Sequence, residues 1–349
     1  MGKKERIFTG WTGVKLAGLL VGVIGWMGCL SGCRQEMRYY EVKGRLHTPY
    51  QIKFQYTQPL DREIDEQLKY FYYLFNAFDS TSVISKINRN EAMEVDTLFA
   101  AVFREAMKVS EQTGGAYDIT CAPLINLWGF GFSHQDSVSA AHIDSVQAFV
   151  GYRKVRLDGN RVVKEDPRLI LNCSSLADGC VCDMLARMLE SKGITNYMID
   201  FGGEIRVKGV NPRGESWRLG ITKPIDDASG IMQEIQQVVH FDQPMGMATS
   251  GNYRNFYIKD GRKYAHTIDP REGCPVQRDI LSATVVAPEA MVADAYATAC
   301  MVLGSEGARR LKEQVPEIEY FLICSDSLRA DGYRVEYSEG FEQYMVGRQ

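Results

Sequence analysis

Hydrophobic and polar positions alternate first as a strand and then as a helix once the chain enters its main domain. Residues 51–56 alternate polar and apolar side chains, which predicts a strand. Asp61 then stands as an N-cap before apolar residues at helical spacing, which are Ile64, Leu68, Phe71, Tyr72 and Phe75. We interpret this aromatic stripe as a face that packs into the core.

Later segments continue the mixture of helices and strands. A helix is predicted over residues 98–112, ending at Gly114-Gly115, and a hairpin over residues 154–165 around Asp158-Gly159. A strand at residues 168–171 is expected to lead into a helix that ends at Gly193. Strand patterns dominate residues 197–287, and helices over residues 290–303 and 305–315 precede a strand at 319–324. This order predicts an α+β fold, a single large domain with mixed, mostly antiparallel sheets and flanking helices.

The first 32 residues have the pattern of a lipoprotein signal peptide. Lys3, Lys4 and Arg6 precede an apolar stretch at residues 16–30 that is short and rich in glycine for a membrane span. The segment ends in Leu-Ser-Gly-Cys at Cys33, the order that precedes an acylated cysteine. We therefore predict a signal peptide at residues 1–32, lipidation of Cys33, a tether at 33–44 and the domain at 45–349.

An uncleaved anchor helix is the alternative for this segment, although Lys15 interrupts its apolar run. Both interpretations place the domain in the bacterial cell envelope, anchored to the membrane and facing the periplasm or the exterior.

The composition argues against nucleic acid as a partner and against a framework of disulfides or zinc. The chain is 45% hydrophobic and 24% charged with a formal net charge of −4, so it lacks the basic balance of a nucleic-acid-binding protein. Nine cysteines include Cys29 in the signal peptide and Cys33, and the remainder have no regular spacing. Neither a disulfide framework nor a zinc site is indicated, and buried free thiols are expected.

Five polar or glycine-rich segments stand at predicted element ends, where function concentrates. TGGAYDIT (113–120) is either a helix end before a strand or a contact to a ligand. DFGGEIRVKG (200–209) lets backbone approach a ligand closely but lacks the dinucleotide-binding pattern. MATSGNY (247–253) is either a phosphate-holding turn or simply a tight turn.

The last two segments carry titratable groups. In YAHTIDPREG (264–273), His266 in a rigid turn is a candidate acid or base, or else an exposed histidine beside a capping Asp269. In VADAYATACMVLG (292–304), Asp294 and Thr298 share one helical face. Their oxygens suit Mg²⁺, although Asp294 could instead only complement the helix dipole.

In this order the segments resemble the ApbE family of FAD:protein FMN transferases. The family reads SxLSxxN, TxGAFDIT, LWGF, VGY, DLGxxAKGYxxD, GGEIRxxG, TSGxY, HIIDPxTG and ADAxATAxxVLG. This chain also has SVISKIN (82–88), LWGF (127–130) and VGY (150–152). The resemblance covers nearly all of the chain after the tether and implies a fold similar to the T-fold.

The resemblance implies a Mg²⁺-dependent reaction in which FAD is cleaved, FMN is joined through its phosphate to a Thr or Ser of an extracytoplasmic acceptor, and AMP leaves. It makes His266 the catalytic residue that removes the acceptor proton, and it makes Asp294, Thr298 and Ser175 the Mg²⁺ ligands. Phe78 matches an aromatic position suited to stacking on a flat ring. The nucleotide-binding positions that it implies are Phe78, Ala116, Tyr117, Asp118, Asn172, Asp178 and Thr267.

Three positions depart from the family pattern. Asn172 stands where Asp is usual, and Asp178 where a Lys or an acid occurs. A Lys at position 178 would attract the diphosphate, whereas a carboxylate repels it unless Mg²⁺ intervenes. Asn172 can still hydrogen-bond a base or a ribose. The family's Met-Gly-Thr near the mature start is reduced to Leu-His-Thr at residues 46–48.

Several functions remain open. The leading one is a transferase acting on flavin-acceptor proteins of membrane electron-transfer complexes. An FAD pyrophosphatase that releases FMN and AMP, and a flavin-binding lipoprotein with impaired catalysis, are the alternatives. A purely structural lipoprotein conflicts with so many intact segments. A tether of roughly ten residues would span under about 20 Å, which favours membrane-bound or closely docked acceptors.

Overall fold

The computed structural model describes residues 36–45, 48–131, 138–224, 234–252, 256–259 and 262–347. The predicted signal peptide, the predicted lipidation site Cys33 and residues 46–47 lie outside the described residues. The chain divides into two units, Met1–Arg38 and Tyr39–Gln349, and the helices found among the described residues belong to the second. No helix in the described part of the chain has the length and apolar character of a membrane span.

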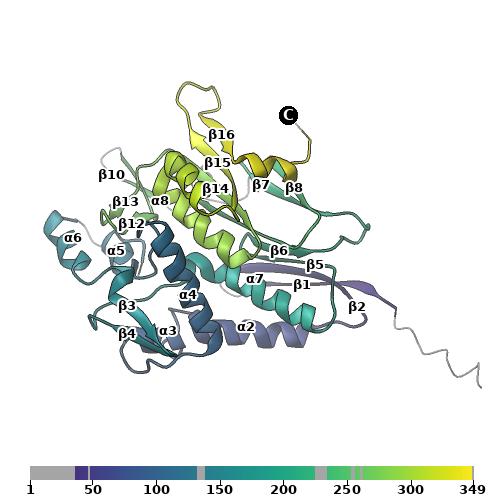
Figure 1. The fold of residues 1–349 in the computed structure, drawn as a ribbon, viewed down its shortest axis with the longest axis horizontal. Helices are drawn as coiled ribbons and strands as arrows, with labels where there is room; N and C mark the ends of the chain where they lie inside the picture. Colours follow the sequence, from purple (N-terminus) through teal and green to yellow (C-terminus); the bar gives the residue numbers. More distant parts are fainter. Residues whose placement is uncertain are drawn as a thin grey trace, which may run out of the picture. The chain divides into compact units, whose positions relative to one another are not determined.

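A large sheet, whose eight strands in the described part of the chain are not all neighbours in sequence order, forms the centre of the domain (Figure 1). Its strands follow the order β1-β2-β5-β6-β9-β14-β15-β16, and every pairing from β2 to β16 is antiparallel. The strands are β1 (Arg38–Arg45), β2 (Pro49–Tyr56), β5 (Tyr197–Phe201), β6 (Glu204–Lys208), β9 (Met245–Gly251), β14 (Ile280–Ala287), β15 (Glu319–Ser325) and β16 (Tyr333–Tyr337).

Four hairpins and short pairs accompany this sheet. They are β3 (Val155–Asp158) with β4 (Arg161–Lys164), β7 (Trp217–Thr222) with β8 (Ile235–Phe241), β10 (Phe256–Lys259) with β11 (Arg262–Ala265), and β12 (Ile268–Asp269) with β13 (Cys274–Pro275). All four are antiparallel. The predicted α+β class with mostly antiparallel sheets is therefore confirmed.

Both faces of the central sheet are covered, which explains why the inner strands β5 and β14 are buried along almost their whole length. In β5, Ile199 packs into the core shared with the helices, whereas Met198 packs into a second core with Trp217 of β7. In β14, Val285 and Val286 divide between the same two cores. Successive strand residues point to opposite faces, so a strand covered on both sides buries nearly every side chain.

The helices among the described residues are α2 (Asp61–Phe75), α3 (Val83–Asn88), α4 (Thr97–Gln112), α5 (Ala122–Leu127), α6 (Ala140–Gln147), α7 (Ser174–Ser191) and α8 (Ala290–Gln314), with 3₁₀ turns η2 (Tyr152–Lys154) and η3 (Glu339–Tyr344). Helices α2, α3, α4, α7 and α8 share the core on one face of the central sheet, whereas α5 and α6 pack in a separate apolar cluster. Helices α7 and α8 lie side by side (Figure 1). A Cβ at Gly179 would lie 2.4 Å from the carbonyl oxygen of Ala290, so only glycine allows this approach.

Several predicted boundaries are confirmed. Helix α4 ends before Gly114 and Gly115, which both have positive φ, and β3 and β4 form the predicted hairpin. The two predicted C-terminal helices are separated by Gly304, whose φ of 77° and ψ of 173° interrupt α8. The interruption is held by Asp279, which accepts hydrogen bonds from the backbone N–H and the hydroxyl of Ser305.

Three predictions about local structure were wrong. The tether does not extend to Gly44, because Arg38–Arg45 form the edge strand β1, with Tyr40 stacked on Phe54. Asp61 is the first residue of α2 and not its cap; the N-cap is Leu60, which makes no side-chain bond.

Residues 168–171 also form no strand. The backbone of Leu171 bonds to the side chain of Asn88 instead, through its N–H at 2.8 Å and its carbonyl at 2.9 Å. The side-chain amide of Asn88 thus supplies the backbone hydrogen bonds that a neighbouring strand would otherwise make.

The cysteines within the described residues are free thiols, and all except the half-buried Cys274 are buried. Burial raises the pKa of the Cys173 thiol to about 12. These thiols therefore act as small apolar core residues.

Candidate active site

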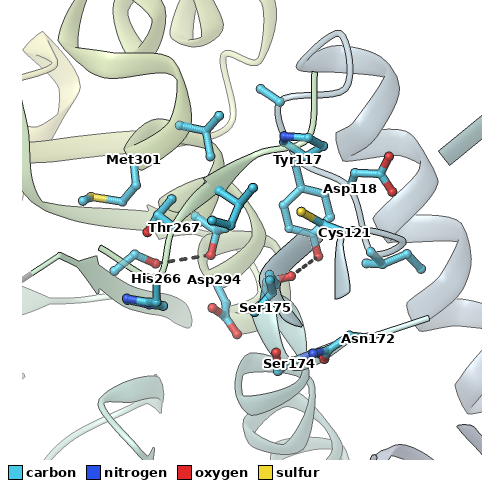
Figure 2. A pocket seen from close by; sticks show the side chains of 18 of the residues that line it. Tyr117, Asp118, Cys121, Asn172, Ser174, Ser175, His266, Thr267, Asp294 and Met301 are labelled. Carbon is cyan, nitrogen blue, oxygen red and sulfur yellow. Dashed lines mark hydrogen bonds between the residues drawn. The ribbon is translucent and has the colours of Figure 1, made fainter. Parts of the chain in front are cut away.

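A cavity of about 420 Å³ lies where the N-terminal parts of α7 and α8 meet three loops. It brings together most of the residues predicted from the sequence, which are Ala116, Tyr117, Asp118, Asn172, Ser175, His266, Thr267, Asp294 and Thr298. All of them except Ala116 and Thr298 are labelled in Figure 2. They come from segments that are distant in the chain. The predicted binding and catalytic positions thus share one concave surface.

Asp294 lies on the first turns of α8 and is almost fully buried. Its Oδ2 accepts a hydrogen bond of 3.2 Å from the backbone N–H of Gly179 on α7. Burial, together with repulsion from Asp178, raises the pKa of Asp294 well above its ordinary value. A nearby cation would therefore strongly stabilise the charged form of this carboxylate.

Hydroxyl groups surround this carboxylate. Thr298 lies one turn further along α8, and its Oγ1 is 3.3 Å from the Oγ of Ser250. Ser175 lies at the start of α7 and donates a hydrogen bond of 3.0 Å to the hydroxyl of the buried Tyr117 (Figure 2). The parts of α7 and α8 that line the cavity therefore bring a carboxylate and hydroxyl oxygens together, beside the apolar Met301 and Val302.

These oxygen donors fit a magnesium ion. The buried charge of Asp294 has no cation bonded to it among the described residues, and hydroxyl oxygens line the same cavity. Within that part of the chain no cluster of three or more His, Cys, Asp or Glu residues is arranged to hold a metal. One carboxylate with hydroxyl or carbonyl oxygens suits Mg²⁺, which completes its shell with water and substrate phosphates.

Asp118 connects two of the loops that form the cavity. Its carboxylate oxygens accept bonds of 2.7 Å from the N–H of Thr120 and 2.7 Å from the N–H of Tyr152. The hydroxyl of Thr120 in turn accepts the N–H of Gly151 at 2.8 Å. These bonds fix the loop before α5 against η2, while Asp118 also lines the cavity, and its role in nucleotide binding stays a prediction.

His266 follows directly after β11 and lies half-buried at the cavity wall. Its ring meets Phe130 edge-on, with the ring centroids 6.5 Å apart. Phe130 begins an aromatic row of stacked rings, defined as Phe130, Tyr257, Tyr264 and Trp128. This row packs the β10–β11 hairpin, and with it His266, against the turn after α5.

The loop behind His266 is held by polar contacts. Trp128 donates its indole N–H to the carbonyl of Gly273 at 2.8 Å, and Arg271 forms a two-bonded ion pair with the buried Asp269. Burial raises the pKa of Asp269, but the hydrogen bonds and the positive charge of Arg271 outweigh burial and bring this pKa below its ordinary value. Asp269 is therefore an anchor for the loop, and His266 is directed at the cavity.

Phe78 and Asp178 do not line this cavity. Phe78 is 79% exposed in the loop after α2. Asp178 lies on α7 behind the cavity, where its Oδ2 would be 3.3 Å from a Cβ at Gly202, close to the carboxylate of Glu204. The roles of both residues in nucleotide binding stay predictions.

Asp178 is a destabilising buried carboxylate. Burial raises its pKa to about 6, above the ordinary value of 3.8. The folded state therefore holds the proton more tightly than the unfolded state, so stability is lost as the pH rises from about 4 to above 6 and stays lower at neutral pH.

We expect Asp178→Asn to increase the free energy of unfolding by about 3 kcal/mol at pH 7, since the pKa rises from 3.8 to about 6 and each pKa unit corresponds to roughly 1.4 kcal/mol. The gain should shrink as the pH falls towards 4 and vanish below about pH 3, where Asp178 is protonated in both the folded and the unfolded state. Urea unfolding in EDTA measures it, with the exposed Asp144→Asn as the matched control. A variant that is less stable than the wild type at pH 7 would show that this carboxylate has a favourable partner.

The sequence analysis missed Asp183, which fixes α8 from the neighbouring helix. Its carboxylate accepts the N–H groups of Ala290 at 3.0 Å and Met291 at 2.9 Å, and Arg206 lies 3.6 Å away. A carboxylate at a helix N-terminus satisfies free donors and the helix dipole. Asp183 thereby sets the position of the turn that carries Asp294.

The MATSGNY segment is only partly the turn that the sequence suggested. Residues Met245–Gly251 form strand β9 in the middle of the central sheet, and Thr249, Ser250 and Gly251 at its end line the cavity. The adjacent hydroxyls were the signal that identified this segment as a candidate binding site.

Comparison with known proteins assigns the class first. In fold, the chain is similar to flavin transferase ApbE from Vibrio cholerae, with a TM-score of 0.76 at 32% identity, covering 88% of this chain and 100% of that one. It is also similar to the flavinyl transferase ApbE of Pseudomonas stutzeri in its apo form, with a TM-score of 0.78 at 28% identity, covering 89% and 98%. The α+β domain is thus of the flavin transferase type.

Sequence comparison then gives the family. The sequence model of the ApbE family matches residues 46–322, and the chain belongs to the ApbE family. A Vibrio cholerae relative named FAD:protein FMN transferase is 33% identical over 331 residues, covering 90% of this chain and 96% of its own. A Haemophilus influenzae relative of the same name is 32% identical over 345 residues, covering 93% and 97%.

Proposed function

We propose that this protein is an FAD:protein FMN transferase. It would cleave the diphosphate of FAD, attach FMN through a phosphoester bond to a Thr or Ser hydroxyl of an acceptor protein, and release AMP. The observation that carries the proposal is the single cavity that holds His266 together with Asp294, Thr298 and Ser175. A base and a set of oxygen ligands are the two requirements of such a phosphoryl transfer.

His266 would act on the acceptor. Its imidazole removes the hydroxyl proton as the acceptor oxygen forms a bond to the FMN phosphorus. The bond from that phosphorus to the bridging oxygen breaks, and its electron pair leaves with AMP. The aromatic row and the Trp128 bond to Gly273 hold His266 in place for this step.

Asp294, Thr298 and Ser175 would hold Mg²⁺, which offsets negative charge on the diphosphate when bound. The carboxylate of Asp294 supplies the charge, and its bond from Gly179 keeps it oriented. The hydroxyls of Thr298 and Ser175 lie in the same cavity wall. Asp183 maintains the start of α8 so that these groups keep their spacing.

Incubation of the full-length protein in detergent with FAD, Mg²⁺ and a Thr-containing acceptor peptide tests the proposal. Mass spectrometry of the peptide should find the added mass of FMN, with one AMP released for each modified peptide. Release of FMN and AMP without an acceptor would establish an FAD pyrophosphatase instead. Tight FAD retention without AMP release in Mg²⁺ would establish a flavin-binding protein.

We further propose that Cys33 carries lipid and holds the enzyme at the membrane of the cell envelope, where exported FAD and acceptor subunits of electron-transfer complexes meet it. The targeting pattern before Cys33 supports this location. Cys33→Ser should move the protein from the membrane fraction to the soluble fraction on ultracentrifugation, without changing FMN transfer in detergent. Retention of the variant in the membrane fraction would favour an uncleaved anchor.

A further inference from the structure

The DFGGEIRVKG segment, which the proposed reaction leaves unused, contains a buried arginine. Residues Glu204–Lys208 of this segment form strand β6, and the side chain of Arg206 is only 14% exposed. Among the described residues, its Nε and Nη1 atoms are buried without a hydrogen-bond partner. Its ion-pair partner is Asp183 on α7, with 3.6 Å between Nε and Oδ1. Burying a charge with few hydrogen bonds is costly, so this carboxylate is the main compensation for the guanidinium.

Arg206 lies beside the N-terminus of α8. Its partner across the strand pair is Gly246 of β9, and a Cβ at Gly246 would lie 2.3 Å from the backbone nitrogen of Ala290. Directly opposite residues of neighbouring strands point to the same face of a sheet, so the first turn of α8 packs on the face that carries Arg206. A helix N-terminus carries partial positive charge, which a neighbouring arginine repels. An anion is therefore needed between these two positive groups.

The carboxylate of Asp183 is that anion. It accepts the N–H groups of Ala290 and Met291, and Arg206 approaches the same Oδ1 that Ala290 uses. Glu289, the N-cap residue of α8, makes no capping bond with its own side chain, so Asp183 supplies the cap from α7. Burial raises the pKa of Asp183 to about 6, and the positive charge of Arg206 opposes this rise. Arg206 thus favours the charged form of the carboxylate that holds the helix.

We propose that Arg206 is a positioning residue for the Mg²⁺ site, acting through Asp183 to hold the first turn of α8 in place. The inference rests on the proposed function and adds a role for β6 in metal binding. Asp294 lies about one helical turn after Ala290, so a frayed or shifted first turn displaces its carboxylate. Residues that orient metal ligands without touching the metal typically change metal affinity by about 10- to 100-fold when they are replaced.

A second ion pair between the same two elements provides a matched control. Lys208, two residues further along β6 and therefore on the same face, pairs with Glu190 of α7 at 2.8 Å. Within the described chain, Glu190 accepts hydrogen bonds from Lys208 and Tyr197, and it makes none to α8. Arg206→Met and Lys208→Met each break an ion pair between β6 and α7, but only Arg206→Met affects the cap of α8.

Hydrogen exchange of the full-length protein in detergent and EDTA, followed by mass spectrometry, measures the cap without metal. In Arg206→Met the amides of residues 290–294 should exchange about tenfold faster than in the wild type, because the first turn of α8 is held less firmly. Lys208→Met should leave their exchange unchanged.

Titration of the melting temperature with Mg²⁺ then measures the metal site. The Mg²⁺ dissociation constant should rise about tenfold or more in Arg206→Met and stay at the wild-type value in Lys208→Met. Arg206→Lys keeps the positive charge and should bind Mg²⁺ more tightly than Arg206→Met, because the contact to Asp183 depends on charge and not on a pair of hydrogen bonds.

Wild-type Mg²⁺ affinity in Arg206→Met would overturn the inference. An equal loss of affinity in Lys208→Met would also overturn it, since that pattern reflects only a lost link between β6 and α7. If Arg206→Met does not fold, Arg206→Gln, which is neutral but polar, decides by the same measurements. Failure of the proposed function is distinguishable: the wild type would then form no FMN-peptide in Mg²⁺, whereas hydrogen exchange in EDTA would still report on Arg206.

Discussion

His266→Ala is expected to reduce FMN transfer to an acceptor peptide by about 10²- to 10⁴-fold, the usual contribution of a positioned general base. FAD binding in EDTA should change little, because most of the cavity wall is formed by other residues, from α7, α8, the end of β9 and the loop after α4. Mass spectrometry of the peptide measures the transfer, and fluorescence measures the binding.

His240→Ala is the matched control for this prediction. His240 is a half-buried histidine of β8 in the separate β7–β8 hairpin, 3.9 Å from Asp242 and outside the cavity lining. Its replacement should leave transfer unchanged. If His266→Ala kept more than about a tenth of wild-type transfer at unchanged stability, another group would have to remove the acceptor proton.

Asp294→Asn is expected to affect activity and stability in opposite directions. Removal of the carboxylate charge should lower AMP release in Mg²⁺ by about 10³-fold, because a metal contributes several kcal/mol to charge stabilisation. In EDTA the variant should melt at a higher temperature than the wild type, since burial disfavours the charged form of Asp294. The amide oxygen can still accept the N–H of Gly179, so the helix contact is retained.

Magnesium titration provides a second readout for this residue. Mg²⁺ at 100 times its dissociation constant should stabilise the wild type by about 2.7 kcal/mol and leave Asp294→Asn unaffected. Glu306→Gln serves as the control, because Glu306 is exposed on the same helix, lies outside the cavity lining and forms an ion pair with Arg310 at 2.5 Å. An Mg²⁺ response equal to that of the wild type in Asp294→Asn would exclude Asp294 as a ligand.

The sequence alone determined the elements whose signals are local. The apolar spacing of α2, the glycines after α4 and the break at Gly304 each act within a few residues, so their physical causes are visible in the chain. The order of the polar segments likewise identified His266, Asp294 and Thr298 as candidates before any of them could be placed in space.

The sequence analysis failed where distant groups decide the structure. Residues 168–171 have a strand pattern, but Asn88 satisfies the backbone of Leu171 and no neighbouring strand pairs with it. The tether was predicted too long because the partner of β1 is another strand, β2, and because Tyr40 finds its apolar contact in Phe54.

Only the tertiary structure decided which candidates act together and how each is held. Gly179 and Gly246 leave no room for a Cβ beside residues 289–291, so α8 approaches both α7 and β9 closely enough to bring Asp294 to the cavity. Asp118, by contrast, proved to be bonded to backbone N–H groups. Sequence spacing records neither close packing nor the hydrogen bonds that distant loops supply, because both depend on atoms that the fold brings together.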